Sequence, residues 1–371
     1  MKILMVAPFE AKGRYKGGIT YIAEHIYNEE QYFKNKNILI EKFDTCRINR
    51  NIKKTGKISL NNLFNFFKIY TDLPKENNKK NYDMIYYHSS VRLALLKDLF
   101  VIKKIRRKNK SKIILHIHFA EYDKIMFSSK IINRTIISIM NKSLEKIIFL
   151  SEQTSKEFVK NGLSSKKVSI IYNFHNLKYS EIEINNKVDL QQKGKKIEVL
   201  FLASIDKRKG IIDALQALDR IEENYTFHIC GTINDLSIEQ DFKYLINKLG
   251  DKVILHGYVS GEKKSKLLLQ SDVLLLPSYG EGLPISIIEG LAAGCSIITT
   301  CVGAIPEVLS ENNGYIIEPG NVKHLRSILE TVICDYELRQ EHIKNNIIYS
   351  KKFGLNKFIN NLKDVFEEVM L

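Results

Sequence analysis

Short apolar segments alternate with helix-like segments along nearly the whole chain, and this alternation limits the fold more than any other feature. Runs such as Lys2–Pro8, Tyr82–His88 and Lys112–Phe119 are brief and rich in Ile, Leu and Tyr, which is typical of buried strands. Each run is followed by a stretch with helical periodicity. Because neighbouring parallel strands need long, usually helical crossovers, the pattern predicts an α/β fold with doubly wound parallel sheets.

One polar interruption in this alternation indicates two domains. The chain has 371 residues, which is more than one hydrophobic core usually serves. We predict an N-terminal Rossmann-like domain at 1–175, a linker at 176–196 and a second Rossmann-like domain at 197–354. The last segment, 355–371, is expected to pack back onto the first domain, and the two domains are expected to face a central cleft.

The positive charge is concentrated in the first half of the chain. Residues 1–200 contain 39 Lys/Arg and 19 Asp/Glu, whereas residues 201–371 contain 18 and 23. The densest basic run, Lys103–Lys112, follows an apolar helical segment. This arrangement suits attraction to an anionic membrane surface, worth about 1 kcal/mol per charge, although a solvated lysine-rich face is an equal alternative. No RNA-reading motif is present, so nucleic acid is not expected as a partner.

Cysteine spacing and terminal sequence indicate a reducing, cytoplasmic setting. The five cysteines show no CxxC spacing, which favours free thiols over a zinc site. The N-terminal apolar run is too short for a signal peptide, and no run of about 18 uncharged apolar residues occurs. The chain also contains no Asp-x-Asp pair. We therefore expect a cytoplasmic protein that needs no metal or other cofactor, with contact at the inner face of the cell membrane.

Two glutamates mark the candidate site. Glu289 is the only charged residue between Leu283 and Val302, and a lone carboxylate is costly to bury unless it is paired. Glu281 lies eight positions earlier in a glycine-rich loop that follows an apolar strand. Ligands of open α/β sheets bind at the carboxyl ends of the strands, so two carboxylates here suit a ligand rich in hydroxyls. The alternative for Glu289 is a local Lys or Arg partner, or solvent.

The loop itself suits a diphosphate. Gly280 and Gly282 allow a ligand to approach the backbone closely, and Pro284 suits the first position of a helix that Gly294 would end. Free amide groups at a helix start bind anions. Within the helix, Glu289 could accept hydrogen bonds from the two hydroxyls of a ribose.

These motifs resemble a known enzyme family. GEGLPISIIEGLAAG at 280–294, CVGAIPEVL at 301–309 and NNGYIIEPGN at 312–321 are similar to the nucleotide-binding half of GT-B glycosyltransferases, specifically the retaining family 4. The resemblance covers nearly the whole chain. It implies the GT-B fold and transfer of a sugar from a nucleotide diphosphate sugar.

The resemblance also implies roles for residues of the second domain. Glu281 and Glu289 match the family's E-x7-E pair, in which the first glutamate lies by the donor sugar and the second holds the ribose. Lys209 matches the lysine that contacts the donor diphosphate. The family usually has an arginine at the position of Ser204, and Arg208 is the candidate substitute. Gly282, Leu283 and Pro284 complete the predicted donor loop.

In the first domain, Gly17 and Gly18 match the family loop that faces the donor phosphate and the acceptor. His118 matches a histidine near the donor sugar, and we assign it a catalytic role together with Lys209 and Glu281. Period-two alternation places His116 on the same strand face as His118, and His116 is expected to be structural. His88 is a candidate for the acceptor side. Asn173, near the predicted hinge, is not expected to act directly.

The sequence therefore predicts a retaining glycosyltransferase of the hexosyltransferase type. The basic half suggests a glycan or polyprenyl-linked acceptor, as in bacterial surface polysaccharide biosynthesis. Two alternatives remain open: a sugar-nucleotide 2-epimerase of the same fold, and a non-enzymatic protein that binds an anionic polymer. The segments around 230–232 and 257–259 are expected to contact the donor base, and they do not distinguish uracil from guanine.

Overall fold

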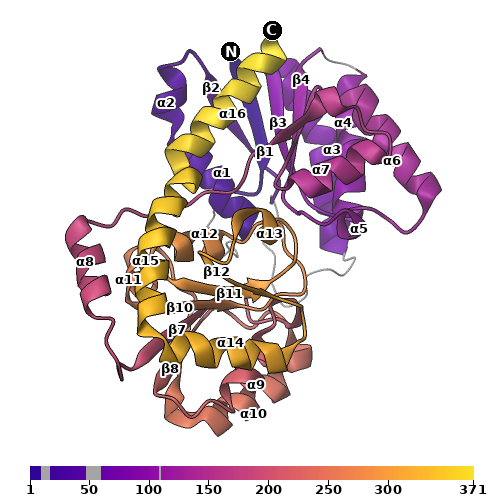
Figure 1. Cartoon of the computed structure of the whole chain (residues 1–371). Helices are drawn as coiled ribbons and strands as arrows, with labels where there is room; N and C mark the ends of the chain where they lie inside the picture. The colour runs from indigo at the N-terminus through magenta and orange to yellow at the C-terminus, as the bar shows by residue number, and fades with distance from the viewer. Residues whose placement is uncertain (10–16, 47–59, 108–109) are drawn as a thin grey trace. The chain divides into compact units, whose positions relative to one another are not determined.

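The chain folds into two compact α/β units (Figure 1). A computed structural model describes residues 1–9, 17–46, 60–107 and 110–371. Unit 1 comprises Met1–Tyr172 and Phe358–Leu371, and unit 2 comprises Asn173–Lys357. Each unit contains a six-stranded sheet in which every recorded pair of neighbouring strands is parallel. The predicted doubly wound α/β fold is therefore confirmed in both units.

The sheet of unit 1 has the strand order β2-β1-β3-β4-β5-β6. The strands are β1 (Lys2–Ala7), β2 (Leu39–Asp44), β3 (Met84–Ser89), β4 (Lys112–Ile117), β5 (Lys146–Phe149) and β6 (Val168–Ile170). The helices are α1 (Gly18–Asn28), α2 (Glu30–Lys34), α3 (Leu60–Lys80), α4 (Leu93–Arg106), α5 (Tyr122–Ile125), α6 (Lys130–Ser143) and α7 (Glu152–Lys160). The strands β1, β3, β4 and β5 are almost entirely buried, as expected for a sheet with helices on both faces.

The last helix, α16 (Leu355–Met370), returns the chain to unit 1. Its Phe366 is fully buried, and the ring lies 5.2 Å from that of Tyr86 and 6.2 Å from that of Phe33 (centroid distances). Lys146 of β5 forms an ion pair with Glu368. The end of the chain thus completes the core of the unit that the beginning of the chain starts.

The sheet of unit 2 has the order β12-β11-β10-β7-β8-β9. Its strands are β7 (Ile197–Leu202), β8 (Tyr225–Cys230), β9 (Val253–Gly257), β10 (Val273–Leu276), β11 (Ser296–Thr300) and β12 (Gly314–Ile317). Its helices are α8 (Glu181–Asp189), α9 (Ile211–Leu218), α10 (Glu239–Leu249), α11 (Gly261–Gln270), α12 (Ile285–Ala292), α13 (Ile305–Val308), α14 (Val322–Cys334) and α15 (Tyr336–Ser350). The chain adds strands first on one side of β7 and then, from β10 onward, on the other side.

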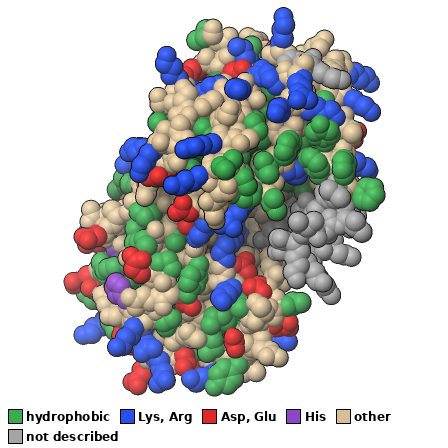
Figure 2. Space-filling view, turned by 90° about the vertical axis from the view of Figure 1, so that its right-hand side faces the viewer, with side chains coloured by type: hydrophobic (Ala, Val, Ile, Leu, Met, Phe, Trp, Pro, Cys, Tyr) green, Lys and Arg blue, Asp and Glu red, His purple; other side chains and the backbone are tan. Residues whose placement is uncertain are grey.

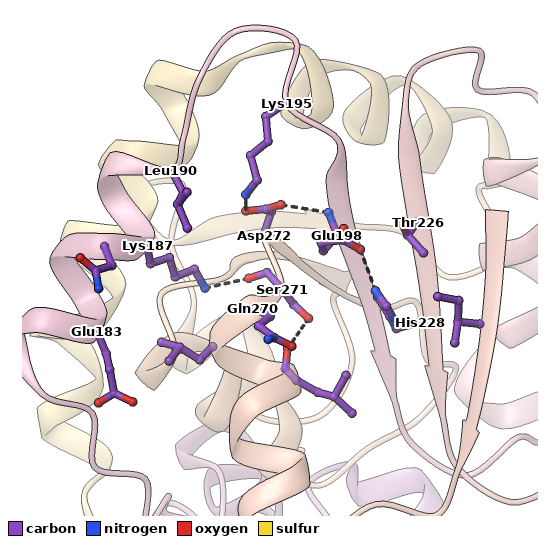
Figure 3. A pocket seen from close by; sticks show the side chains of 14 residues that line it. Glu183, Lys187, Leu190, Lys195, Glu198, Thr226, His228, Gln270, Ser271 and Asp272 are labelled. Carbon is purple, nitrogen blue, oxygen red and sulfur yellow. Dashed lines mark hydrogen bonds and ion pairs between the residues drawn. The ribbon is translucent and has the colours of Figure 1, made fainter. Parts of the chain in front are cut away.

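The segment predicted as a linker, 176–196, contains helix α8 and lies within unit 2. Lys187 of α8 is buried and donates a hydrogen bond of 2.7 Å to the carbonyl oxygen of Ser271 (Figure 3). It donates a second one, of 2.6 Å, to the carbonyl oxygen of Ala293. The sequence did not indicate this docking because the buried side of α8 is anchored by a lysine rather than by an apolar stripe.

Helix α8 also borders a cavity of about 590 Å³ at the end of the sheet where β7 and β8 begin (Figure 3). Two pairs of polar side chains line it. Lys195 contacts Asp272 at 2.6 Å, and Glu198 contacts the Nε2 atom of His228 at 2.7 Å. These pairs hold the starts of the strands together.

Candidate functional site

The order of strands in unit 2 creates a switch point between β7 and β10. These two strands are neighbours, and the chain leaves them toward opposite sides of the sheet. The loop 203–210 follows β7, and the loop 277–284 follows β10. In open α/β sheets this is the position where ligands bind, outside the carboxyl ends of the two strands. The predicted residues Arg208, Lys209 and Glu281 lie on these two loops.

An ion pair joins the two loops. The Nζ atom of Lys209 lies 2.6 Å from Oε1 of Glu281, and Nη1 of Arg208 lies 3.6 Å from Oε2. Ser278 donates a 2.8 Å hydrogen bond to the same carboxylate. The side chain of Glu281 is only 7% exposed and that of Lys209 only 14%. The structure therefore brings together a cationic group and an acidic group that the sequence predicted for one site, 72 residues apart.

The surroundings of Glu281 keep it ionised. Burial alone would raise the pKa of its carboxyl group, but the charges of Lys209 and Arg208, with hydrogen bonds from Lys209 and Ser278, hold the pKa below its usual value of 4.5. A buried carboxylate between two cations is a fixed negative charge beside two groups that can bind phosphate.

This pKa shift predicts a pH dependence of stability. Because the folded-state pKa lies below the unfolded-state value, the stabilisation is present above about pH 4.5 and is lost as the pH falls through the folded value. We expect the free energy of unfolding by urea to fall less steeply below pH 4.5 in Glu281→Gln than in the wild type. Glu337→Gln, at an exposed position of α15, serves as the control. Equal acid slopes in the wild type and Glu281→Gln would contradict this assignment.

Backbone contacts fix the loops around the ion pair. The N–H of Tyr279 donates to the carbonyl of Arg208 (2.8 Å), and the N–H of Ala304 donates to the carbonyl of Gly282 (2.9 Å). Gly210 has φ +71°, and a Cβ atom there would lie 1.9 Å from the carbonyl oxygen of Pro277. The close approach of the two loops therefore requires glycine at this position.

Substitution of Gly210 by alanine is expected to destabilise the protein by about 3 kcal/mol or more, since the methyl group would displace the Pro277 backbone. Gly194→Ala is a matched control, because Gly194 has φ +79° but no atom within 4 Å of the position that a Cβ would take. That change should cost only the backbone strain of about 1–2 kcal/mol. Urea unfolding measures both values, and similar losses in the two variants would show that the loop contact is unimportant.

Helix α12 begins directly after the loop that carries Glu281. Pro284 is its N-cap rather than the predicted first helical residue, because its ψ of 125° is extended. Gly294 follows the helix end with φ +68°, which fits the predicted stop. The Leu283 carbonyl accepts a 2.7 Å hydrogen bond from the side chain of Asn173. Asn173 therefore holds the loop 277–284 at Leu283, a role that the sequence did not reveal.

Glu289 lies on α12 and is 2% exposed. Its Oε1 atom pairs with Nζ of Lys264 from α11. This is the local basic partner that the sequence left open as an alternative to ligand binding. Lys264 was not identified from the sequence, because it is one of three lysines in GEKKSK at 261–266 and nothing distinguishes it from its neighbours. The pair stabilises the buried carboxylate without a ligand.

The position of Ser204 provides no second cation. Its hydroxyl donates a 2.6 Å hydrogen bond to Asp206, whose other carboxylate oxygen accepts from the N–H of Lys209. The side chain of Arg208 is 47% exposed, and its Nη1 donates to the carbonyl of Gly280 at 2.6 Å. Arg208 is therefore the cation next to Lys209 on this loop.

In unit 1, Gly17 is the N-cap of α1 and Gly18 is its first residue. The N–H of Tyr21 donates to the Gly17 carbonyl, and Gly17 has no side chain that could cap the helix start. Residues 10–16, which precede it, lie outside the described residues. The contact of Gly17 and Gly18 with a donor phosphate or an acceptor stays a prediction.

Three histidines gather near the carboxyl ends of β3 and β4. Nδ1 of His88 lies 2.7 Å from Nε2 of His118, and Nδ1 of His116 lies 2.7 Å from the hydroxyl oxygen of Tyr86. Burial, with weaker repulsion between the rings, lowers the pKa of His88 and of His116 far below 6.5, and burial lowers the pKa of His118 to about 3. All three rings are therefore neutral at physiological pH.

The same three residues form a group that meets a distance test for metal ligands. One ring nitrogen from each lies within 4.8 Å of the others. The rings of His88 and His118 are parallel within 2° and share a hydrogen bond. In this arrangement the rings of His88 and His118 are hydrogen-bond partners of each other.

Comparisons with known proteins show which chains this one is similar to. Residues 183–348 match the family model described as "Glycosyl transferases group 1". The chain is 25% identical to an uncharacterized glycosyltransferase of Methanocaldococcus jannaschii, over 100% of this chain and 99% of that protein. It is 25% identical to N,N'-diacetylbacillosaminyl-diphospho-undecaprenol alpha-1,3-N-acetylgalactosaminyltransferase of Campylobacter jejuni, over 59% and 60% of the two chains.

A solved structure supports the fold. The crystal structure of Anabaena HepE in complex with UDP-glucose superimposes with a TM-score of 0.71 at 18% identity, covering 99% of this chain and 100% of that chain. At this identity the similarity concerns the arrangement of the strands and helices.

Proposed function

We propose that in this glycosyltransferase of the GT-B fold unit 2 binds a nucleotide diphosphate sugar and unit 1 binds a glycan or lipid-linked acceptor. The observation that carries the proposal is the Lys209–Glu281 ion pair at the switch point of unit 2. It places a cation, a carboxylate and the start of α12 at the ends of adjacent strands, where a sugar diphosphate needs them.

The proposed roles follow from charge. Lys209, with Arg208 beside it, would stabilise the negative charge that develops on the leaving diphosphate, together with the amide groups around Gly282, Leu283 and Pro284. No metal is needed for this role. Glu281 would accept hydrogen bonds from hydroxyls of the donor sugar, and Glu289 from the ribose.

We further propose transfer with retention, as in family 4. The bond from the anomeric carbon to the diphosphate oxygen breaks, and a bond to the acceptor oxygen forms on the same face. The acceptor proton passes to an oxygen of the leaving diphosphate. His118 and the start of α1 at Gly17 and Gly18 would contact the substrates from unit 1.

A sugar-nucleotide panel tests the proposal. The purified protein is incubated with UDP-, GDP- and ADP-sugars, with and without a bacterial lipid extract as acceptor, and products are separated by mass spectrometry. Transfer to an acceptor with release of nucleoside diphosphate is the expected result. Isomerisation of the donor without an acceptor would identify a 2-epimerase. Absence of turnover, with binding to anionic polymer only, would reject the enzyme assignment for these donors.

A surface of unit 1 suits contact with the membrane that would hold a lipid-linked acceptor. Helices α3, α4 and α6 are successive neighbours in one layer. Large apolar side chains are exposed on them, including Phe67 (53%), Phe100 (49%) and Ile131 (77%). Helix α6 carries three basic residues and no acidic one. Figure 2 shows hydrophobic and basic side chains interspersed over a face of the molecule. We propose that this surface contacts the anionic inner face of the cell membrane.

Part of the predicted basic run has a different role. Arg106 pairs with Glu145 and donates hydrogen bonds to the carbonyl of Ser143, and Lys104 donates to the carbonyl of Tyr70. These two residues connect elements within unit 1, whereas Lys103 and Arg107 are exposed. No described helix has the length and apolar character needed to cross a membrane.

Replacing Ile131 and Ile132 together by serine is expected to weaken vesicle binding about tenfold or more, because each buried isoleucine contributes about 1.5–3 kcal/mol when fully removed from water. Ile182→Ser is the matched control, since Ile182 is 72% exposed on α8 of unit 2. Sedimentation with vesicles containing phosphatidylglycerol measures the effect. Equal binding by the wild type and the double variant would reject this surface.

A further inference from the structure

The pairing of β3 with β4 assembles a hydrogen-bonded histidine group that the sequence did not predict. In the parallel register His88 lies opposite His116, and His118 follows β4 with its N–H bonded to the carbonyl of Ser89 at 3.0 Å. The two side-chain hydrogen bonds already described connect Tyr86 with His116 and His88 with His118. One nitrogen of each ring, namely Nε2 of His88, Nε2 of His116 and Nδ1 of His118, is buried without a hydrogen-bond partner among the described residues.

The hydrogen bond from Tyr86 determines the tautomer of His116. Tyr86 is fully buried, and His116 Nδ1 is the hydrogen-bond partner that the described structure gives its hydroxyl. A buried hydroxyl proton needs an acceptor. Tyr86 therefore donates to Nδ1, which leaves the proton of neutral His116 on Nε2. Nε2 of His116 is therefore a hydrogen-bond donor.

His88 and His118 share one proton in the hydrogen bond between their rings. Each neutral imidazole carries one N–H, so of the two outer nitrogens, His88 Nε2 and His118 Nδ1, one is a donor and the other an acceptor. A donor at Nδ1 of His118 requires that His88 carries its proton on Nδ1 and donates it to Nε2 of His118.

We propose that His88 is a positioning residue that holds His118 in the tautomer with its proton on Nδ1. His118 then presents a fixed N–H donor to a substrate oxygen, and it does so without an ionised partner. The inference rests on the proposed transferase function, in which His118 contacts the substrate. It adds that His88 acts through His118, and that the Tyr86–His116 pair keeps the neighbouring ring from competing for the His88 proton.

Nuclear magnetic resonance tests the tautomer without any ligand. In full-length protein labelled with ¹⁵N-histidine, long-range nitrogen–proton correlations distinguish protonated from unprotonated ring nitrogens, and His118→Gln assigns the signal. We expect His118 with the proton on Nδ1 in the wild type. A His118 signal with the proton on Nε2 would overturn the proposal, as would a bound transition metal at one equivalent in the purified protein.

Variants of His88 test the function. The amide nitrogen of asparagine can replace Nδ1 of histidine, whereas glutamine reaches the position of Nε2. With the sugar nucleotide turned over fastest in the panel above, His88→Leu and His88→Gln should lower kcat about 10- to 100-fold with little change in KM, as when a partner that only orients an imidazole is lost. His88→Asn should recover most of kcat and the wild-type His118 signal. Equal kcat in the Asn and Gln variants would overturn the proposal.

The two measurements separate this inference from the proposed function. If the panel gives no turnover, the proposed transferase function fails, while the His118 signal still supports or overturns the assigned tautomer. If turnover is found and the His118 signal has its proton on Nε2, the positioning role alone is rejected. Thermal unfolding of each His88 variant shows whether a loss of kcat reflects loss of the fold.

Discussion

Replacing Lys209 by methionine is expected to lower kcat by about 100- to 1000-fold, the range observed when one preorganised group that stabilises a developing negative charge is removed. Methionine keeps much of the side-chain volume, so the loss reports on charge. Lys207→Met is the control, because Lys207 is an exposed lysine on the same turn. Steady-state release of nucleoside diphosphate measures both variants. A Lys209→Met enzyme with wild-type kcat would contradict the proposed role.

Because Lys209 forms an ion pair with Glu281, the stability of Lys209→Met must be measured as well as its activity. Without Lys209, the buried carboxylate of Glu281 loses its 2.6 Å partner, and breaking a buried pair from one side costs about 3–5 kcal/mol. Reduced activity in Lys209→Met could therefore reflect unfolding. The double variant Lys209→Met with Glu281→Gln also removes the buried negative charge. It should recover stability but not kcat, which separates the structural role of the pair from its proposed chemistry.

Replacing Glu289 by glutamine is expected to weaken nucleotide binding by about 100-fold, since a hydrogen bond to a charged group contributes about 1.5–3 kcal/mol. The effect should appear in the dissociation constant and much less in kcat. Titration calorimetry with UDP and with GDP measures it and also identifies the preferred base. Glu262→Gln is the control, because Glu262 is an exposed acid on α11, the helix that carries Lys264. Unchanged affinity in Glu289→Gln would remove Glu289 from the donor site.

Lys264 provides a test of whether Glu289 binds the ribose or serves only as the ion-pair partner of Lys264. In the structure its ammonium group pairs with the same carboxylate that we assign to the ribose. If Glu289 acts only as a partner for Lys264, the double variant Glu289→Gln with Lys264→Met should bind nucleotide as the wild type does. If Glu289 binds ribose, the double variant stays weak. The same titration distinguishes these results.

Local patterns predicted the fold because buried parallel strands have few alternatives. Runs such as Lys112–Phe119 are apolar on both faces, and β4 is found within that run. The strand β2 was missed, since it is an edge strand with alternating exposure, and its sequence LIEKFD contains three charged residues. Helix α8 was read as a linker for a related reason: its buried anchor is Lys187.

The candidate site was predictable only where its residues lie in one continuous motif. Glu281 and Glu289 stand out in the sequence because they interrupt an apolar, glycine-rich stretch. The contacts that residues on other elements make with the site could not be predicted in this way, although His88 and Asn173 were themselves noted. Lys264 comes from α11, Asn173 from the start of unit 2, and His88 from a neighbouring strand. Their positions depend on the strand order and register, which no local pattern encodes.

The return of α16 to unit 1 has a consequence for synthesis on the ribosome. Unit 1 combines Met1–Tyr172 with Phe358–Leu371, and Asn173–Lys357 must be translated between these two segments. At roughly 5–20 residues per second this takes about 10–40 s. During that interval the nascent first half exposes the apolar surface that Phe366 later covers. A ribosome-associated chaperone that shields this surface should therefore raise the yield of native enzyme more than it does for proteins whose domains are continuous in sequence.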